Sequence, residues 1–118
     1  MQVLVLVKAT EESETEAMPL DWTEAMMAAM GRFNDELRAA GVLLMAAGLE
    51  PSAGARRVRF DGSARAVSTG PFLPAEDLVA GFWLWEVKDL DEATAWVQRC
   101  PNPMPGPSVI EIRPIAGT

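Results

Sequence analysis

Three segments of this chain are apolar at consecutive positions, and this feature limits the folds that can hold them. Residues 1–8, 42–47 and 80–87 each have the length of a strand and carry apolar side chains on both faces. In the first, one face holds Val3, Val5 and Val7 and the other Leu4 and Leu6; in the last, one face holds Phe82 and Leu84 and the other Trp83, Trp85 and Val87. Burial of such side chains is favourable, so exposing either face to water loses stability. We therefore expect three central strands in a sheet that is covered on both sides.

Two further segments have the periodicity of amphipathic helices. The predicted helix over residues 21–40 carries an apolar stripe at steps of three or four, formed by Trp22, Met26, Met30, Phe33, Leu37 and Ala40. Asp21 and Asp89 each precede such a stripe and each has an acid three residues later, which predicts two capped helix starts. Gly41 and Pro101 are expected to end the two helices.

The rest of the chain predicts a hairpin, a last strand and loops. Residues 56–60 and 64–69 flank Asp61-Gly62-Ser63, which is a strong hairpin signal. Four arginines in these two strands predict that the hairpin is exposed to solvent at the periphery of the fold. Residues 108–113 alternate as a final strand. Residues 10–16 are polar and acidic, and we expect a loop there.

The order strand, helix, strand, inserted hairpin, strand, helix, strand is the split βαβ pattern of a ferredoxin-like α+β fold. We expect a single domain over residues 1–118. Right-handed crossovers put both helices on one face of the sheet. The uncovered face is apolar, so we expect a second copy to cover it, sheet against sheet, in a homodimer. The alternative is a monomer whose hairpin folds back over that face.

Composition excludes several function classes. The chain has 118 residues and a net charge of −7, which disfavours nucleic acid as a partner. The longest nearly apolar run, residues 42–49, is too short to cross a bilayer, and no signal peptide is recognisable, so we expect a cytoplasmic protein with no membrane partner. Histidine is absent and Cys100 is the only cysteine, which removes the commonest general base and metal ligands. We expect no cofactor and no metal.

Several short motifs, in this order, resemble the YCII-related family: FNDELRAAGVLL, GLEPS, RVRF, TGPF, AGFWLWEV, RCPNP and IEIRPI. The chain is most similar to the branch named for an Asp-Gly-Pro-Phe motif. The resemblance implies a dimeric α/β barrel. It also implies a possible regulatory protein partner, since some members are encoded near, or fused to, sigma factors of the extracytoplasmic-function class. Some members of the wider family are lyases or dehydrochlorinases that use a His–Asp pair.

This chain departs from those catalytic patterns. The position of the family histidine falls near Met30, and the aspartate that precedes a proline in the lyase-like members falls near Cys100. The branch motif begins with Thr69 in place of aspartate, in Thr69-Gly70-Pro71-Phe72. A His–Asp mechanism therefore does not transfer to this sequence.

The ligand-binding candidates form three groups. Met30 and Phe33 lie on the Met- and aromatic-rich helix face, which either packs in the core or lines a cleft between helix and sheet with Trp83 or Trp85 as its floor. The second group is Thr69 and Phe72, which either line a pocket or belong to a turn that closes the hairpin.

The third group is Glu111 and Arg113, which are two apart on the last strand and so share a face. They either bind a polar ligand inside a dimer or form a solvated ion pair.

Three hypotheses for function remain open. The first is a non-catalytic dimeric module that binds a small apolar or amphipathic ligand or a regulatory partner. The second is a lyase- or isomerase-type enzyme that uses carboxylates such as Glu111, Glu76 or Asp77, for which a carboxylate buried in a pocket is required. The third is a purely structural dimer.

Overall fold

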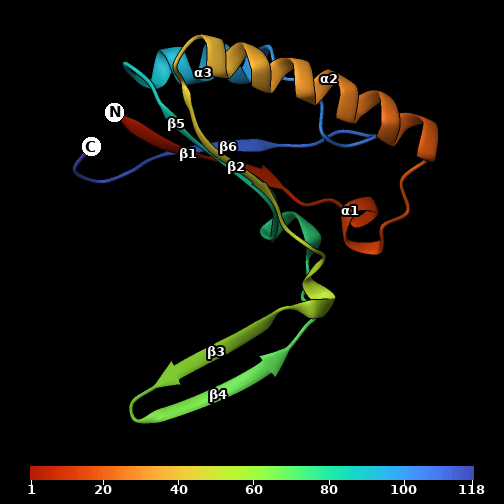
Figure 1. Ribbon diagram of the computed structural model, residues 1–118. Coiled ribbons are helices and arrows are strands. Elements are labelled where there is room, and N and C mark those ends of the chain that lie inside the picture. The colour runs from red at the N-terminus through yellow and green to blue at the C-terminus, as the bar shows by residue number, and fades with distance from the viewer.

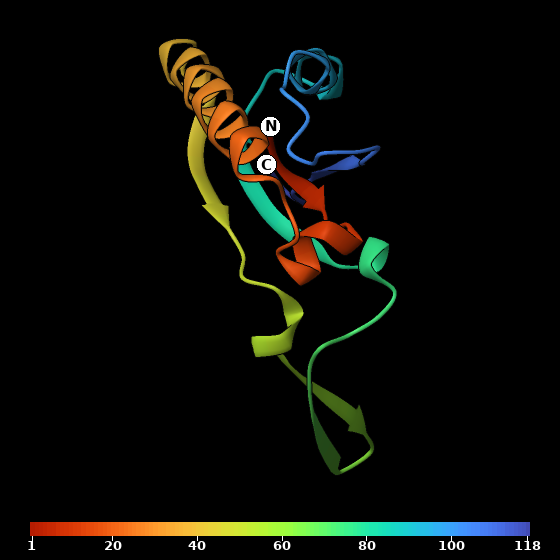
Figure 2. The ribbon, with the colours of Figure 1, turned by 90° about the vertical axis from the view of Figure 1, so that its right-hand side faces the viewer.

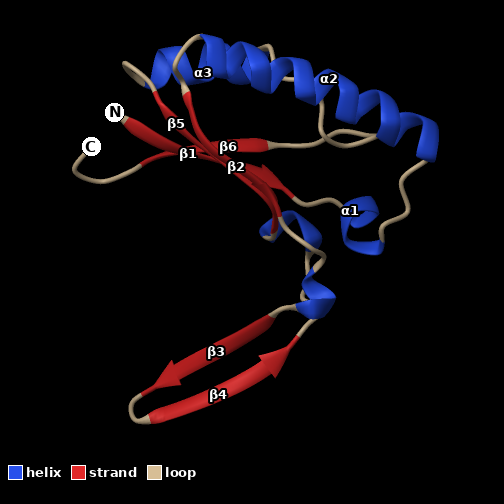
Figure 3. Cartoon of the chain, in the orientation of Figure 1, coloured by secondary structure: helices blue, strands red, loops and turns tan.

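The computed structural model describes residues 1–118 and is an α+β structure with three α-helices and two antiparallel sheets (Figures 1 and 3). The elements are β1 (Gln2–Lys8), α1 (Glu11–Thr15), α2 (Leu20–Ala39), β2 (Leu43–Gly48), β3 (Arg56–Asp61), β4 (Ala64–Thr69), β5 (Val79–Glu86), α3 (Leu90–Gln98) and β6 (Ile110–Pro114). Two single-turn 3₁₀ helices, Ser52–Gly54 and Ala75–Asp77, flank the pair β3–β4.

The larger sheet has four strands in the order β2-β5-β1-β6, and every neighbouring pair is antiparallel. This order and the positions of α2 and α3 are consistent with a ferredoxin-like fold. Both helices cover the same face of the sheet, as the crossover argument predicts (Figures 1 and 2). The expectation that residues 42–47 form a central strand is wrong, because β2 lies at an edge.

The predicted division of side chains between the two faces is confirmed by burial. Val3, Val5 and Val7 are buried under the helices together with Trp83 and Trp85. The register pairs Leu4 with Leu84 and Leu6 with Phe82, so these four half-buried side chains share the opposite, open face. No helix lies against the open face (Figure 1).

The core is centred on an aromatic cluster beneath α2 and α3. The Phe33 ring lies edge-on to three indoles, with ring centroids 6.1 Å from Trp83, 6.4 Å from Trp85 and 6.2 Å from Trp96. Edge-to-face pairs at this spacing are favourable beyond their buried area. The Nε1 atom of Trp85 is buried without a hydrogen-bond partner, so Trp85 acts here as an apolar group.

Helix starts differ in two places from the sequence prediction. The expectation of a loop over residues 10–16 is wrong, because Glu11–Thr15 form the short helix α1. Its capping box consists of the Thr10 hydroxyl, which accepts from the Ser13 amide, and the Ser13 hydroxyl, which accepts from the Thr10 amide. Helix α2 begins at Leu20 with Pro19 at the N-cap, so Asp21 lies in the first turn and is not the cap. The prediction for Asp89 is confirmed, since its carboxylate accepts from the Glu92 amide at 2.9 Å.

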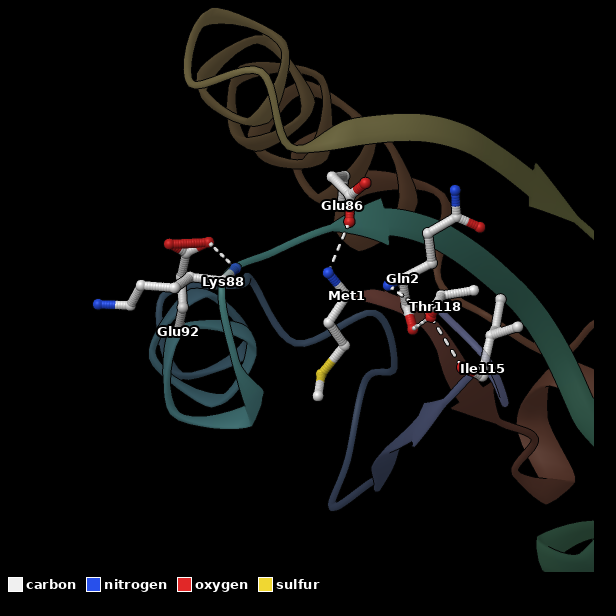
Figure 4. Close-up of polar contacts among 7 residues, drawn as sticks. All are labelled: Met1, Gln2, Glu86, Lys88, Glu92, Ile115 and Thr118. Carbon is white, nitrogen blue, oxygen red and sulfur yellow. Dashed lines mark hydrogen bonds and ion pairs between the residues drawn. The ribbon is translucent and has the colours of Figure 1, made fainter.

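Polar contacts hold the two chain ends against the sheet (Figure 4). The Met1 ammonium lies 3.0 Å from the Glu86 carboxylate. The Gln2 amide donates to the Thr118 hydroxyl at 2.9 Å, and that hydroxyl donates to the Ile115 carbonyl at 2.8 Å. These contacts fasten β1 to β5 and to the segment that follows β6.

No helix combines the length and apolar character needed to cross a bilayer.

The pair β3–β4, called the arm below (residues 56–69), stands apart from the rest of the chain. All of its strand residues are exposed. It projects from the end of the sheet near α1, on the side away from α2 and α3 (Figures 1 and 2). The radius of gyration is 16.0 Å, whereas a compact chain of this length has about 13.5 Å. The arm therefore does not pack against the open face in this structure.

Candidate functional site

A cleft of about 520 Å³ opens between the first half of α2 and the end of the sheet where β2 finishes and β5 begins. Helix α1 and the loop around Met104 complete its walls. The volume lies within the range of small-molecule sites. The residues that line it are mostly apolar.

The floor and walls of the cleft combine an indole with flexible sulfur side chains. Trp83 is among the lining residues, and four methionines surround it: Met18, Met26, Met30 and Met104. The indole Nε1–H of Trp83 donates to Oδ1 of Asn34 at 2.8 Å, which fixes the ring in place. Methionine walls adapt to the shape of what they contact, so this cleft fits an apolar body of variable outline.

The mouth of the cleft is acidic. Its lining includes Glu14, Glu16 and Glu50 and contains no lysine or arginine. Glu14 is held in place by Ser52, whose amide donates to one carboxylate oxygen at 2.9 Å and whose hydroxyl donates to the other. Fixed negative charge at the mouth disfavours anionic ligands and favours neutral or cationic ones.

The structure places the first group of predicted site residues partly in the cleft. Met30 and Trp83 line it, as the cleft hypothesis requires. Phe33 and Trp85 do not; both are buried in the aromatic cluster, at 4% and 0% exposure. The helix stripe therefore serves two purposes, since its first half faces the cleft and its second half packs in the core.

The second group lies at the base of the arm. The Phe72 amide donates to the Ser52 hydroxyl at 2.9 Å, and the Arg57 guanidinium lies over the Phe72 ring at 4.0 Å. Gly70 approaches Ser52 so closely that a Cβ atom there would lie 1.7 Å from the Ser52 carbonyl oxygen. Thr69, the last residue of β4, is exposed. Residues 69–72 thus join the arm to the body. None of them lines the cleft, although Phe72 borders a separate hollow beside Ser52 and Arg57.

The third group lies on the open face of the sheet, away from the cleft. Arg113 donates from Nη1 to Oε2 of Glu111 at 3.1 Å, and both side chains are substantially exposed. Glu76 and Asp77 are exposed in the second 3₁₀ turn, and neither lines the cleft. None of the three carboxylates considered for catalysis therefore reaches the cleft.

Cys100 packs at the margin of the core. Burial raises the pKa of the Cys100 thiol to about 12. The thiol therefore stays protonated at neutral pH and is a poor nucleophile.

Sequence reasoning missed three residues that shape the cleft. Asn34 is a polar residue one turn beyond Met30 on the same helix face, and that interruption of an apolar stripe was the signal available. Glu14 and Met104 reach the cleft from α1 and from the proline-rich loop. Their placement depends on tertiary packing, for which the sequence offers no periodic pattern.

The chain belongs to the YCII-related domain family, whose model matches residues 1–116. It is 29% identical over 106 residues to an uncharacterised protein from Rhizobium meliloti (strain 1021), a match that covers 90% of this chain and 86% of that protein. The family membership agrees with the α+β architecture described above.

Proposed function

We propose that this chain is a dimeric, non-catalytic YCII-related module that binds a small apolar or amphipathic ligand between α2 and the sheet. The observation that carries the proposal is the cleft of about 520 Å³ with Trp83 in its lining. An apolar pocket with a few fixed polar groups is the usual form of a small-molecule site. Here the polar groups are the Asn34 amide and the carboxylates at the mouth.

The charge at the mouth narrows the class of ligand. With Glu14, Glu16 and Glu50 at the mouth and no cationic side chain in the lining, a carboxylate ligand would be repelled. An apolar or aromatic body that carries an amine would place the body among the methionines and the cation at the mouth. We therefore rank amphipathic amines first and neutral aromatic compounds second.

The open face of the sheet supports the dimer. Leu4, Leu6, Phe82 and Leu84 form an apolar row that no helix covers (Figure 1). Sheet-to-sheet pairing of two copies in a closed two-fold pair would bury this row. Within the family we assign the chain to the branch with the Asp-Gly-Pro-Phe motif, with Thr69 in place of the aspartate.

The proposal leaves out catalysis because no carboxylate is buried in the cleft. A carboxylic general base with a pKa suited to its task needs such burial. Glu76, Asp77 and Glu111 are absent from the cleft lining, Glu16 and Glu50 are exposed at the mouth, and Glu14 is already engaged by Ser52.

Thermal unfolding in the presence of a compound library tests this proposal. A ligand at about 100 times its dissociation constant adds roughly 2.7 kcal/mol to the stability of the folded state. With an unfolding entropy of about 0.25 kcal/mol/K for a chain of this size, the midpoint should rise by about 10 °C. The library should contain matched amines, neutral compounds and carboxylates that share one aromatic body.

Two variants of β2 locate the binding site. Ala46 lines the cleft and pairs with Trp83 across the strands, so Ala46→Phe should fill the cleft and abolish the shift. Leu44 is exposed on the same strand and outside the lining, so Leu44→Phe should retain the shift. If no compound raises the unfolding midpoint, or if both variants show the same shift in midpoint, ligand binding in this cleft is refuted.

A further inference from the structure

The arm has an apolar face that its own molecule leaves exposed. Strand pairing sets Val58 opposite Val67 and Phe60 opposite Arg65, so these side chains share one face. Phe60 and Val67 are 69% and 64% exposed. An isolated two-stranded hairpin is marginally stable in water, and apolar exposure of this kind marks an interaction surface. We therefore expect another surface to pack against this face of the arm.

The body of the same molecule does not supply that cover, because the base of the arm is fixed. Ser52 binds Glu14 of α1 through its amide and its hydroxyl, and the same hydroxyl accepts from the Phe72 amide. The Gly70 amide donates to the Ala55 carbonyl at 2.9 Å, immediately before the arm begins. These contacts fix the base of the arm, and its strands run clear of the sheet (Figure 1).

The charge of the arm identifies the surface that fits it. Four arginines against one aspartate give the arm a net charge of +3, so the remainder of the chain, whose total is −7, carries −10. Arg59 lies 3.9 Å from Asp61 of the arm itself, and the other three arginines form no ion pair. The acidic body of this chain is complementary to the arm, and it disfavours nucleic acid as the occupant.

We infer that the arm docks on a second copy of this chain, with the face formed by Val58, Phe60 and Val67 packed against that copy. Arg56 and Arg65, which share that face with the three apolar side chains, lie against carboxylates of the second copy. The inference rests on the proposed dimer and adds to it: each copy holds the other by its arm as well as by its sheet. In a two-fold pair the contact is made twice, so one substitution in the sequence alters two contacts in the dimer.

Analytical ultracentrifugation of two double variants tests the inference. Phe60→Thr with Val67→Thr makes the inferred contact face polar, while threonine keeps the β-propensity of the strands. The dimer dissociation constant should rise about 100-fold, as for loss of central apolar contacts. Ala66→Thr with Ser68→Thr changes the opposite face of β4 and should leave the constant within about threefold of the unsubstituted chain. High salt should weaken the unsubstituted dimer.

Hydrogen exchange of the unsubstituted chain provides a second measurement that requires no variant. Arm amides should exchange quickly in dilute solution and slowly in concentrated solution, because docking protects the hairpin. A dimer that is equally tight in both double variants, or arm amides that exchange alike at both concentrations, would overturn the role of the arm and leave the sheet-to-sheet dimer standing. A chain that stays monomeric at high concentration would overturn both.

Discussion

Replacement of Ser52 by alanine tests whether one hydroxyl couples the arm to the body. Ser52 is 8% exposed, and its hydroxyl both donates to Glu14 and accepts from the Phe72 amide. The alanine variant leaves the Phe72 amide without an acceptor and removes one donor from the Glu14 carboxylate. The Ser52 amide keeps its own bond to Glu14 at 2.9 Å.

The size of the effect follows from these two hydrogen bonds. An orphaned buried amide costs about 1–3 kcal/mol, and a hydrogen bond to a charged group is worth about 1.5–3 kcal/mol. Water reaches part of this site, so we expect the free energy of unfolding to fall by about 2 kcal/mol. An unfolding entropy of about 0.25 kcal/mol/K converts this into a drop of about 8 °C in the unfolding midpoint.

Circular dichroism melts at one fixed protein concentration measure the midpoint, and hydrogen exchange measures protection of the Phe72 amide. Ser68→Ala, an exposed serine in β4, is the matched control and should change the midpoint by less than about 2 °C. If Ser52→Ala behaves like this control in both measurements, the hydroxyl does not couple the arm to α1.

Three further predictions concern packing and titration. Gly70→Ala should unfold at a lower temperature than Gly54→Ala in the same melts. A Cβ atom at Gly70 would lie 1.7 Å from the Ser52 carbonyl oxygen, whereas a Cβ atom at Gly54 would meet open space. Equal unfolding midpoints for the two variants would contradict this prediction. Leu37→Ala empties a fully buried site and should lower the urea-derived free energy of unfolding by about 3 kcal/mol, and a loss below about 1 kcal/mol would contradict its place in the core. The raised pKa of the Cys100 thiol, about 12 against 9.0, leaves roughly a thousandfold less thiolate at pH 8 than in the unfolded chain, so iodoacetamide should label the native protein far more slowly than the denatured one. The stability that depends on this protonated thiol should be fully present below pH 9 and lost as the pH rises towards 12. Alkaline melts of Cys100→Ala, which lacks the thiol, should not show that loss.

The large features of this fold follow from local patterns in the sequence. Alternation along β1 and β5 assigned each side chain to the helix face or the open face, because the two-residue period of a strand leaves only two choices. The Asp61-Gly62-Ser63 signal predicted the arm for a similar local reason, but the loop is one residue shorter than predicted, because Asp61 pairs with Ala64 and the turn is Gly62-Ser63. The central position of β2 was predicted wrongly, since apolar side chains on both faces do not distinguish an edge strand from a middle one.

The candidate site followed from the sequence only where a single helix face carried it. Met30 lies on the stripe of α2, and Trp83 faces that helix from β5, so a cleft between them was predictable. Phe33 lies on the same stripe but in the second half, where the Trp96 ring of α3 closes the space. Helix α1 brings Glu14 to the mouth, and that approach depends on long-range packing that no periodic pattern encodes.

The cluster of rings in the core has an optical consequence. The centroids of Trp83 and Trp85 are 5.6 Å apart and their planes are inclined at 43°, so the strong electronic transitions of the two indoles will couple. Coupled transitions of this kind give paired circular dichroism bands of opposite sign, which vanish when the rings separate. Because Trp83 also borders the cleft, the same bands offer a label-free signal for any molecule that tilts this indole.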